Sequence, residues 1–417
     1  MGKEKSNLKE VVLAISIVYF IFFFINLSGE GYGRKSDSYL GFPKYFYGDS
    51  YRYFQLARAI ADGRLYIYDS IDDIDDEILS FSLGVSDRVY ITQSPGISIV
   101  SAPFYLLFKE PGVYAAASLV GLIACISLYC LLRFFVSDKT SKVITLFYAF
   151  GTYIFTYSQF LYNDVLTCLL VSTSFIMLLK HLRDGKTKNI VFSGIALGLI
   201  PLTKPSAIIL SLVFVPYLYY RKGIKSTLIL LMSLLVGMLP FIAYNIACFG
   251  APLTSGYSSL LAVEDGKFYT VNFTNLNTWK NNPLNIFTLI IVFFITQPIT
   301  LTAVAYLSKT DKGIRYFLVT SFLSLGLLYS FWWNSMGLLC WGWRFMTPIL
   351  PFFAVSSAMA YEKNIIPKKI FWILFYLSSN IAIFSLHPLV WQIFYQFTPI
   401  ANTYYDILAV LPHHPLN

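Results

Sequence analysis

Residues 112–132 read GVYAAASLVGLIACISLYCLL, a run without a single charged side chain. A transmembrane α-helix needs about 20 consecutive apolar residues, so this run is long enough to cross a bilayer. Similar windows recur along the chain, and charged residues make up only 13% of its 417 residues, whereas soluble domains carry about 25%. The composition therefore indicates an integral membrane protein.

The apolar windows predict an all-α polytopic membrane protein with about eleven transmembrane helices. Helices are favoured over a barrel because backbone groups in lipid must be paired within their own segment, and the windows lack the alternating pattern of barrel strands. The predicted spans lie near residues 10–27, 112–132, 143–159, 164–180, 189–203, 205–220, 226–246, 286–307, 316–333, 346–361 and 370–387.

The distribution of charge predicts the orientation of these spans. Most Lys and Arg residues fall into six short segments that share one side if the N-terminus is cytoplasmic, as the positive-inside rule requires. We therefore expect one transmembrane domain, residues 1–417, with two extracytoplasmic loops at residues 28–111 and 247–285. Topology then accounts for the net charge of +9 without a nucleic-acid partner.

The first of these loops contains the candidate catalytic stretch Gly48-Asp49-Ser50-Tyr51-Arg52. Apolar residues recur at helical spacing after Asp49, which predicts a helix lying in the membrane interface, with Arg52 on its polar side. A second interfacial helix is expected within residues 93–108. Asp49 suits a general base at the water interface, but an acid at this position also suits the N-cap of the helix.

Three further charged residues lie where spans are expected to end. Asp164 is either a helix cap or a functional acid, since acids entering membrane helices are usually functional. Lys204 lies on the wrong side for the positive-inside pattern, so it either has a dedicated anionic partner such as a phosphate or snorkels to the interface. Arg344, among tryptophans, suits phosphate binding or cation–π stacking.

The sequence requires no cofactor. The acidic run from Asp69 to Glu77 lacks the ligand and glycine positions of a calcium loop and is better interpreted as a solvated acidic loop. We assign no metal ligand, and a divalent cation remains an open possibility.

With these residues placed, the chain resembles the C-type (GT-C) superfamily of multi-pass glycosyltransferases that use lipid-phosphate sugars. Protein O-mannosyltransferases and the bacterial transferase that adds aminoarabinose to lipid A are members. The acid that often follows the catalytic one in this superfamily is a serine here, Ser50. The matching motifs, in chain order, are Gly48-Asp49-Ser50 with Tyr53 and Ala57, Gln93-Ser94-Pro95-Gly96 with Ala102-Pro103, Asn163-Asp164, Leu202-Thr203-Lys204-Pro205, Asn245 with Phe249-Gly250-Ala251-Pro252 and Gly256-Tyr257, and Trp341-Gly342-Trp343-Arg344-Phe345.

The resemblance implies an inverting membrane glycosyltransferase, which moves a sugar from a polyprenyl-phosphate donor to an acceptor hydroxyl on the extracytoplasmic face. It implies that Asp49 is the base and that Lys204 and Arg344 contact the donor phosphate, while Asp164 positions a substrate or holds the helix end. Expected partners are the polyprenyl-phosphate-linked sugar, a lipid, glycan or protein acceptor, and membrane lipids. Further expected contacts are Arg52 with the donor phosphate, and Tyr53, Gln93, Tyr257 and Trp341 with substrate.

Two other functions fit a polytopic chain that is basic inside. A transporter or lipid flippase typically has charged or broken segments at mid-membrane and paired repeats, whereas most charges here lie outside the predicted spans. An oligosaccharide or polymer ligase is a similar membrane enzyme with a larger donor, and the sequence does not report the size of the donor.

Overall fold

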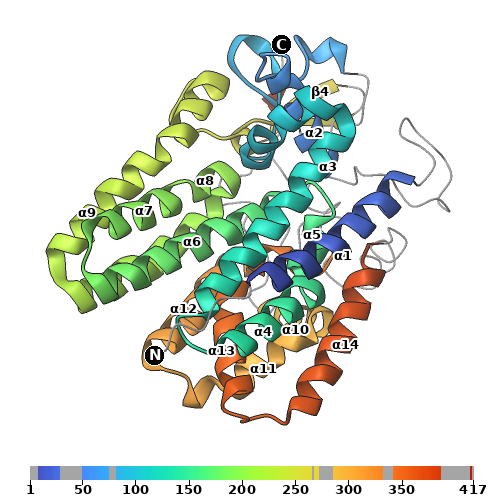
Figure 1. Ribbon diagram of the computed structural model, residues 1–417. Coiled ribbons are helices and arrows are strands. Elements are labelled where there is room, and N and C mark those ends of the chain that lie inside the picture. Colours follow the sequence, from blue (N-terminus) through green and yellow to red (C-terminus); the bar gives the residue numbers. More distant parts are fainter. Residues whose placement is uncertain are drawn as a thin grey trace.

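The computed structural model describes residues 8–28, 49–74, 81–264, 267–271, 285–331, 341–386 and 414–415. The predicted helical class is confirmed, because helices run through most of these ranges (Figure 1). The α-helices are α1 (Leu8–Ser28), α2 (Asp49–Ala61), α3 (Gly96–Leu132), α4 (Asp138–Gly151), α5 (Tyr153–Ser158), α6 (Asn163–Asp184), α7 (Thr187–Gly198), α8 (Ile200–Thr203), α9 (Ser211–Phe249), α10 (Asn285–Thr296), α11 (Leu301–Ala305), α12 (Lys312–Ser330), α13 (Leu350–Glu362) and α14 (Lys368–Phe384).

The predicted number of eleven spans is not confirmed by the helices of the described residues. Four segments are long and apolar enough to cross a bilayer, namely α3, α6, α12 and α9 with the 3-10 helix η3 (Pro205–Leu210) before it. A fifth arises if α10 and the helices after it, which meet at 103°, count as one span. Other predicted spans form shorter helices, such as the 12-residue α7 and the 13-residue α13.

The core between the helices is built largely from aromatic rings. Phe317 of α12 lies 4.6 Å from Phe175 of α6, 5.0 Å from Phe214 of α9 and 5.4 Å from Phe352 of α13, measured between ring centroids. Lipid supplies no hydrophobic drive for helix association, so close packing of this kind must hold the helices together. The rings join α6, α9 and α12, which contribute residues to the cavity described below, to α13.

A small antiparallel sheet connects the two long loops, and the sequence analysis did not predict it. Its order is β2-β1-β3-β4-β5. Ser82 of β1 pairs with Leu260 of β3, and its hydroxyl donates to the carbonyl of Gly256 at 2.7 Å. These contacts bring the second loop against the first loop near α2. The strands are β1 (Phe81–Leu83), β2 (Val89–Ile91), β3 (Leu260–Glu264), β4 (Lys267–Val271) and β5 (His414–Pro415).

Candidate active site

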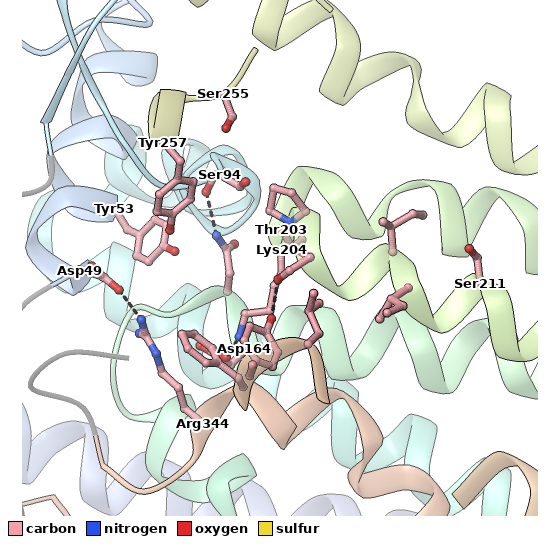
Figure 2. A pocket seen from close by; sticks show the side chains of 18 of the residues that line it. Asp49, Tyr53, Ser94, Asp164, Thr203, Lys204, Ser211, Ser255, Tyr257 and Arg344 are labelled. Carbon is pink, nitrogen blue, oxygen red and sulfur yellow. Dashed lines mark hydrogen bonds and ion pairs between the residues drawn. The ribbon is translucent and has the colours of Figure 1, made fainter. Parts of the chain in front are cut away.

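A cavity of about 560 Å³ lies where both long loops meet the ends of several helices. Figure 2 shows its charged side chains gathered on one side, with Ser211 of α9 at the far side. The polar end of the cavity contains Asp49, Tyr53, Asp164, Lys204, Tyr257 and Arg344. The lining also includes a set of apolar side chains, three of which flank Ser211 in the chain, namely Ile208, Ile209 and Leu212, together with Pro205 and Leu328.

Asp49 forms an ion pair with Arg344 across the cavity. Oδ2 of Asp49 lies 2.5 Å from Nη2 of Arg344, and Nε2 of Gln93 donates to Oδ1 at 2.7 Å. The side chains of Asp49 and Arg344 are 20% and 9% exposed. Asp49 is the first residue of α2, and its carboxylate bonds residues far away in the chain. Such a carboxylate is held in a fixed direction and still reaches the cavity.

Asp164 forms a second ion pair, with Lys204, and both side chains are at least nine-tenths buried. The N-cap of α6 is Tyr162, so Asp164 lies inside the first helical turn. The helix-cap interpretation of Asp164 is therefore wrong. Lys204 has extended backbone between α8 and η3, as expected for a residue before proline. Because an unpaired buried charge is costly, each partner stabilises the other.

Aromatic rings connect the two ion pairs. Nζ of Lys204 lies 4.4 Å from the ring centre of Phe345, and Cζ of Arg344 lies 5.2 Å from the same centre. Phe345 stacks on Tyr329 at 4.3 Å, and Arg344 also lies 4.9 Å over the ring of Tyr162. Both cations thus contact one ring, so the two ion pairs are neighbours in the cavity.

Two tyrosine hydroxyls lie among these charges. Burial raises the pKa of Tyr53 and of Tyr257, and the negative charge of Asp49 raises both further. These hydroxyls therefore stay protonated well above neutral pH and remain hydrogen-bond donors. Figure 2 shows both rings at the polar end of the cavity.

Three residues with expected substrate contacts, Arg52, Gln93 and Trp341, lie outside the cavity lining that the described residues form, although Gln93 bonds the lining residue Asp49. The guanidinium of Arg52 lies 3.9 Å over the ring of Phe81 and donates to Gln55 at 3.0 Å. Arg52 therefore lies beside Gln55 on the predicted polar side of α2, and Phe81 of the unforeseen strand β1 covers its guanidinium. The carbonyl of Trp341 accepts a hydrogen bond from Tyr157 at 2.6 Å.

The sequence analysis assigned no role to Asn163 beyond its place in a motif. Its Nδ2 donates to the carbonyl of Ser94 at 2.7 Å, and its Oδ1 accepts from the backbone N–H of Ile97 at 2.7 Å. Asn163 thereby holds the start of α3 against the start of α6, next to Asp164. A polar residue directly before an acid at a helix start was the signal available in the sequence.

A metal site is not visible in the described ranges, where no three His, Cys, Asp or Glu side chains gather as ligands would. Part of the acidic run, residues 75–77, lies outside those ranges. The structure thus assigns no cofactor.

Comparisons with known proteins address the fold. Residues 93–246 match the sequence model of the dolichyl-phosphate-mannose-protein mannosyltransferase family. ArnT from Cupriavidus metallidurans bound to undecaprenyl phosphate superimposes with a TM-score of 0.57 at 13% identity, over 95% of this chain and 75% of that one. The chain shares the fold of ArnT. The resemblance stated from the motifs is thereby confirmed, and with its apolar helices the chain is an integral membrane protein.

Other comparisons agree with this fold. ArnT in the apo state gives a TM-score of 0.54 at 12% identity, over 87% of this chain and 61% of that one. The Archaeoglobus fulgidus oligosaccharyltransferase in complex with Zn and sulfate gives 0.53 at 13% identity, over 98% of this chain and 58% of that one. The chain thus spans about three fifths of these two proteins. No curated protein sequence matches it.

Proposed function

We propose that the chain is a membrane glycosyltransferase, which moves a sugar from a polyprenyl-phosphate donor to an acceptor hydroxyl on the extracytoplasmic face. The observation that carries the proposal is a cavity that gathers two cations and two acids on one side and is lined by Ile208, Ile209 and Leu212 next to Ser211, which lies on the far side. A polyprenyl phosphate has the same division, an anionic head and a hydrocarbon tail. ArnT, whose structure contains undecaprenyl phosphate, has a similar fold.

The chemistry follows from the charges at the polar end. Asp49 takes the proton of the acceptor hydroxyl, whose oxygen attacks the anomeric carbon while the bond from that carbon to the phosphate oxygen breaks. A single displacement inverts the anomeric centre. Arg344 and Lys204 stabilise the negative charge on the departing phosphate, so no general acid is required. The ion pair between Asp49 and Arg344 links phosphate binding to proton abstraction. A phosphate that binds the guanidinium releases a carboxylate oxygen of Asp49, which can then accept the proton of the acceptor hydroxyl.

Residues in and beside the cavity orient the reactants. Gln93 holds one oxygen of Asp49 and so directs the other toward the cavity. Tyr53 and Tyr257 supply neutral hydroxyl donors for the sugar. Asp164 keeps Lys204 in place until a phosphate arrives. Such fixed positioning supplies a large part of the rate enhancement in a two-substrate reaction.

The experiment measures release of polyprenyl phosphate and transfer of sugar from a panel of polyprenyl-phosphate sugars, with lipid extract of the host as acceptor. Purified wild type is compared with Asp49→Asn. The matched control is Asp62→Asn, an acid directly after α2 whose side chain is 47% exposed. Loss of a general base lowers turnover about 10²–10⁴-fold, so we expect transfer by wild type and Asp62→Asn and almost none by Asp49→Asn.

Other outcomes separate the alternatives. Undiminished transfer by Asp49→Asn rejects Asp49 as the base and directs attention to Asp164. Turnover of oligosaccharide donors with no turnover of single-sugar donors identifies a ligase. Movement of lipid across vesicles without transfer identifies a flippase and rejects the enzyme proposal.

A further inference from the structure

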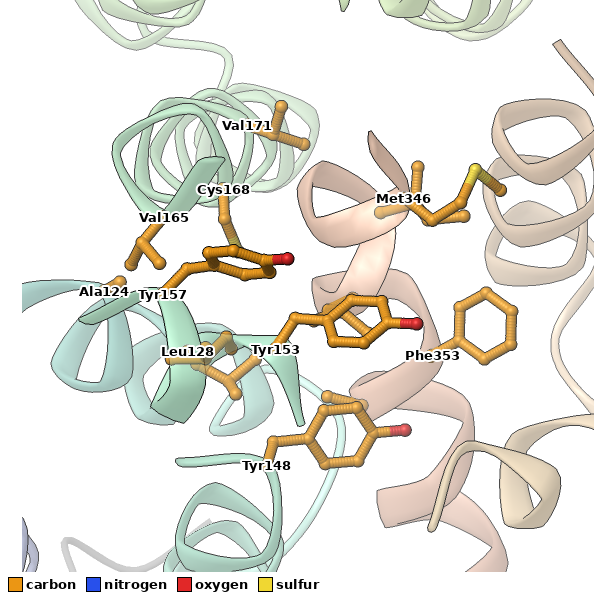
Figure 3. Close-up of a cluster of buried hydrophobic side chains, with 14 of the residues drawn as sticks. Ala124, Leu128, Tyr148, Tyr153, Tyr157, Val165, Cys168, Val171, Met346 and Phe353 are labelled. Atoms are coloured by element: carbon orange, nitrogen blue, oxygen red, sulfur yellow. The ribbon is translucent and has the colours of Figure 1, made fainter. Parts of the chain in front are cut away.

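We propose that two buried tyrosines of α5, Tyr153 and Tyr157, are positioning residues that set the location of Arg344 in the cavity. The inference rests on the proposed function of Arg344 in binding the donor phosphate. Neither tyrosine lines the cavity that the described residues form, and both lie deep among the helices with about 1% of their surface exposed. Figure 3 shows their rings side by side, pointing the same way.

The two hydroxyls bond the backbone on either side of Gly342. The hydroxyl of Tyr157 donates to the carbonyl of Trp341 at 2.6 Å, and the hydroxyl of Tyr153 accepts from the backbone N–H of Trp343 at 2.9 Å. Residues four apart on a helix share one face, so α5 presents both hydroxyls to this segment together. The residue that follows is Arg344, where the 3-10 helix η8 (Arg344–Ile349) begins.

The contact between Tyr153 and this segment requires glycine at position 342. Its φ is +60°, a conformation that side chains rarely adopt, and a Cβ there would lie 2.4 Å from the hydroxyl oxygen of Tyr153. Only glycine therefore allows the segment to approach Tyr153 so closely. The close approach restricts how far the backbone at Gly342 can shift toward Tyr153.

The hydroxyl of Tyr153 is itself held in direction. It lies 2.5 Å from Oγ1 of Thr296, at the end of α10. The hydroxyl of Thr296 donates to the carbonyl of Val292 at 2.7 Å, so the hydrogen of the Tyr153 hydroxyl is directed to Thr296. The backbone N–H of Tyr153 donates to Oε1 of Gln297 at 3.3 Å, next to the bend that follows α10. The segment before Arg344 is thus connected through Tyr153 to α10.

The guanidinium of Arg344 depends on the same helix by a second route. The ring of Tyr157 packs edge-on against the ring of Tyr162 at 5.2 Å, and Cζ of Arg344 lies 4.9 Å over Tyr162. Both the backbone and the charged end of Arg344 are therefore placed by α5. A displacement of about 1 Å in a group that binds a reacting phosphate is enough to lower activity about 10²-fold.

The test compares Tyr153→Phe and Tyr157→Phe with Tyr148→Phe as the matched control. Tyr148 is equally buried, and its hydroxyl bonds Ser357 of α13 at 2.9 Å instead of the segment at Gly342. For each variant we would measure the affinity for polyprenyl phosphate, the turnover and the melting temperature. Since one hydrogen bond contributes about 1 kcal/mol, we expect Tyr153→Phe and Tyr157→Phe each to weaken phosphate binding about fivefold to tenfold. Tyr148→Phe should lower only the melting temperature.

A double-mutant cycle separates positioning from general stability. In an Arg344→Ala background, Tyr153→Phe should cause no further loss of affinity, because the group that it positions is gone. Equal affinities for Tyr153→Phe, Tyr157→Phe and Tyr148→Phe, or additive losses in the cycle, would overturn the inference. Failure of wild type to bind polyprenyl phosphate, or full affinity in Arg344→Ala, would instead reject the proposed function.

Discussion

Replacing Asp164 by asparagine should strengthen the binding of polyprenyl phosphate while destabilising the protein without ligand. Nζ of Lys204 bonds Oδ1 of Asp164, and both side chains are at least nine-tenths buried. Under the proposed function, the donor phosphate must compete with this carboxylate for the ammonium group. Removal of the carboxylate removes the competitor, so the expected effect is opposite in sign to that of removing Lys204.

The magnitude follows from the burial of the pair. A hydrogen bond to a charged group contributes about 1.5–3 kcal/mol net, and the phosphate must replace at least one. If the charged hydrogen bond between Lys204 and Asp164 is already absent, the phosphate should bind about 10- to 100-fold more tightly. Loss of one partner of a buried pair destabilises a protein by about 3–5 kcal/mol, and the amide oxygen of asparagine reduces that cost because it still accepts a hydrogen bond. The melting temperature of Asp164→Asn should therefore fall, and polyprenyl phosphate should raise it more than in wild type.

The assay is equilibrium binding of a short-chain polyprenyl phosphate in detergent, together with thermal unfolding at increasing ligand concentration. Asp62→Asn controls for the loss of a negative charge, and Lys204→Met should weaken binding. Unchanged or weaker binding by folded Asp164→Asn would refute competition between the carboxylate and the phosphate. Asp164 would then favour ligand binding, for example through a contact with the sugar.

Three further outcomes follow from single contacts. Gly342→Ala should lower the free energy of unfolding by about 1–3 kcal/mol, because alanine disfavours the positive φ and its Cβ would clash with Tyr153. Chemical denaturation would measure the loss, and a change near zero would contradict the prediction. Burial raises the pKa of Tyr257, so its hydroxyl still donates a hydrogen bond at about pH 10. The ratio of wild-type turnover to Tyr257→Phe turnover should therefore be the same at about pH 10 as at about pH 7. A ratio approaching one at the higher pH would show that the hydroxyl ionises normally. Arg52→Gln should destabilise by about 1 kcal/mol through its lost contact with Phe81, and reduced phosphate affinity in this variant would return Arg52 to the site.

Several features of the site were predictable because the cost of charge in a membrane is a local property. Asp49, Asp164, Lys204 and Arg344 stand out in an apolar chain, and the structure brings all four to one cavity. Arg52 carries the same charge in a similar context, yet it packs on Phe81. The sequence analysis could not separate these cases, because the strand that covers Arg52 is only three residues long.

By itself, the sequence determined that the chain is a helical membrane protein, since the length and hydrophobicity of its segments leave helices as the structure that satisfies the backbone in lipid. It also determined which few charges need partners. Only the tertiary structure decided which residues form the pairs. Asp49 pairs with Arg344, 295 residues away in the chain, and Asp164 pairs with Lys204, 40 residues away. Pairings of this kind carry no local pattern, because they depend on how the bend after α10, the small sheet and the tyrosines of α5 bring distant segments together.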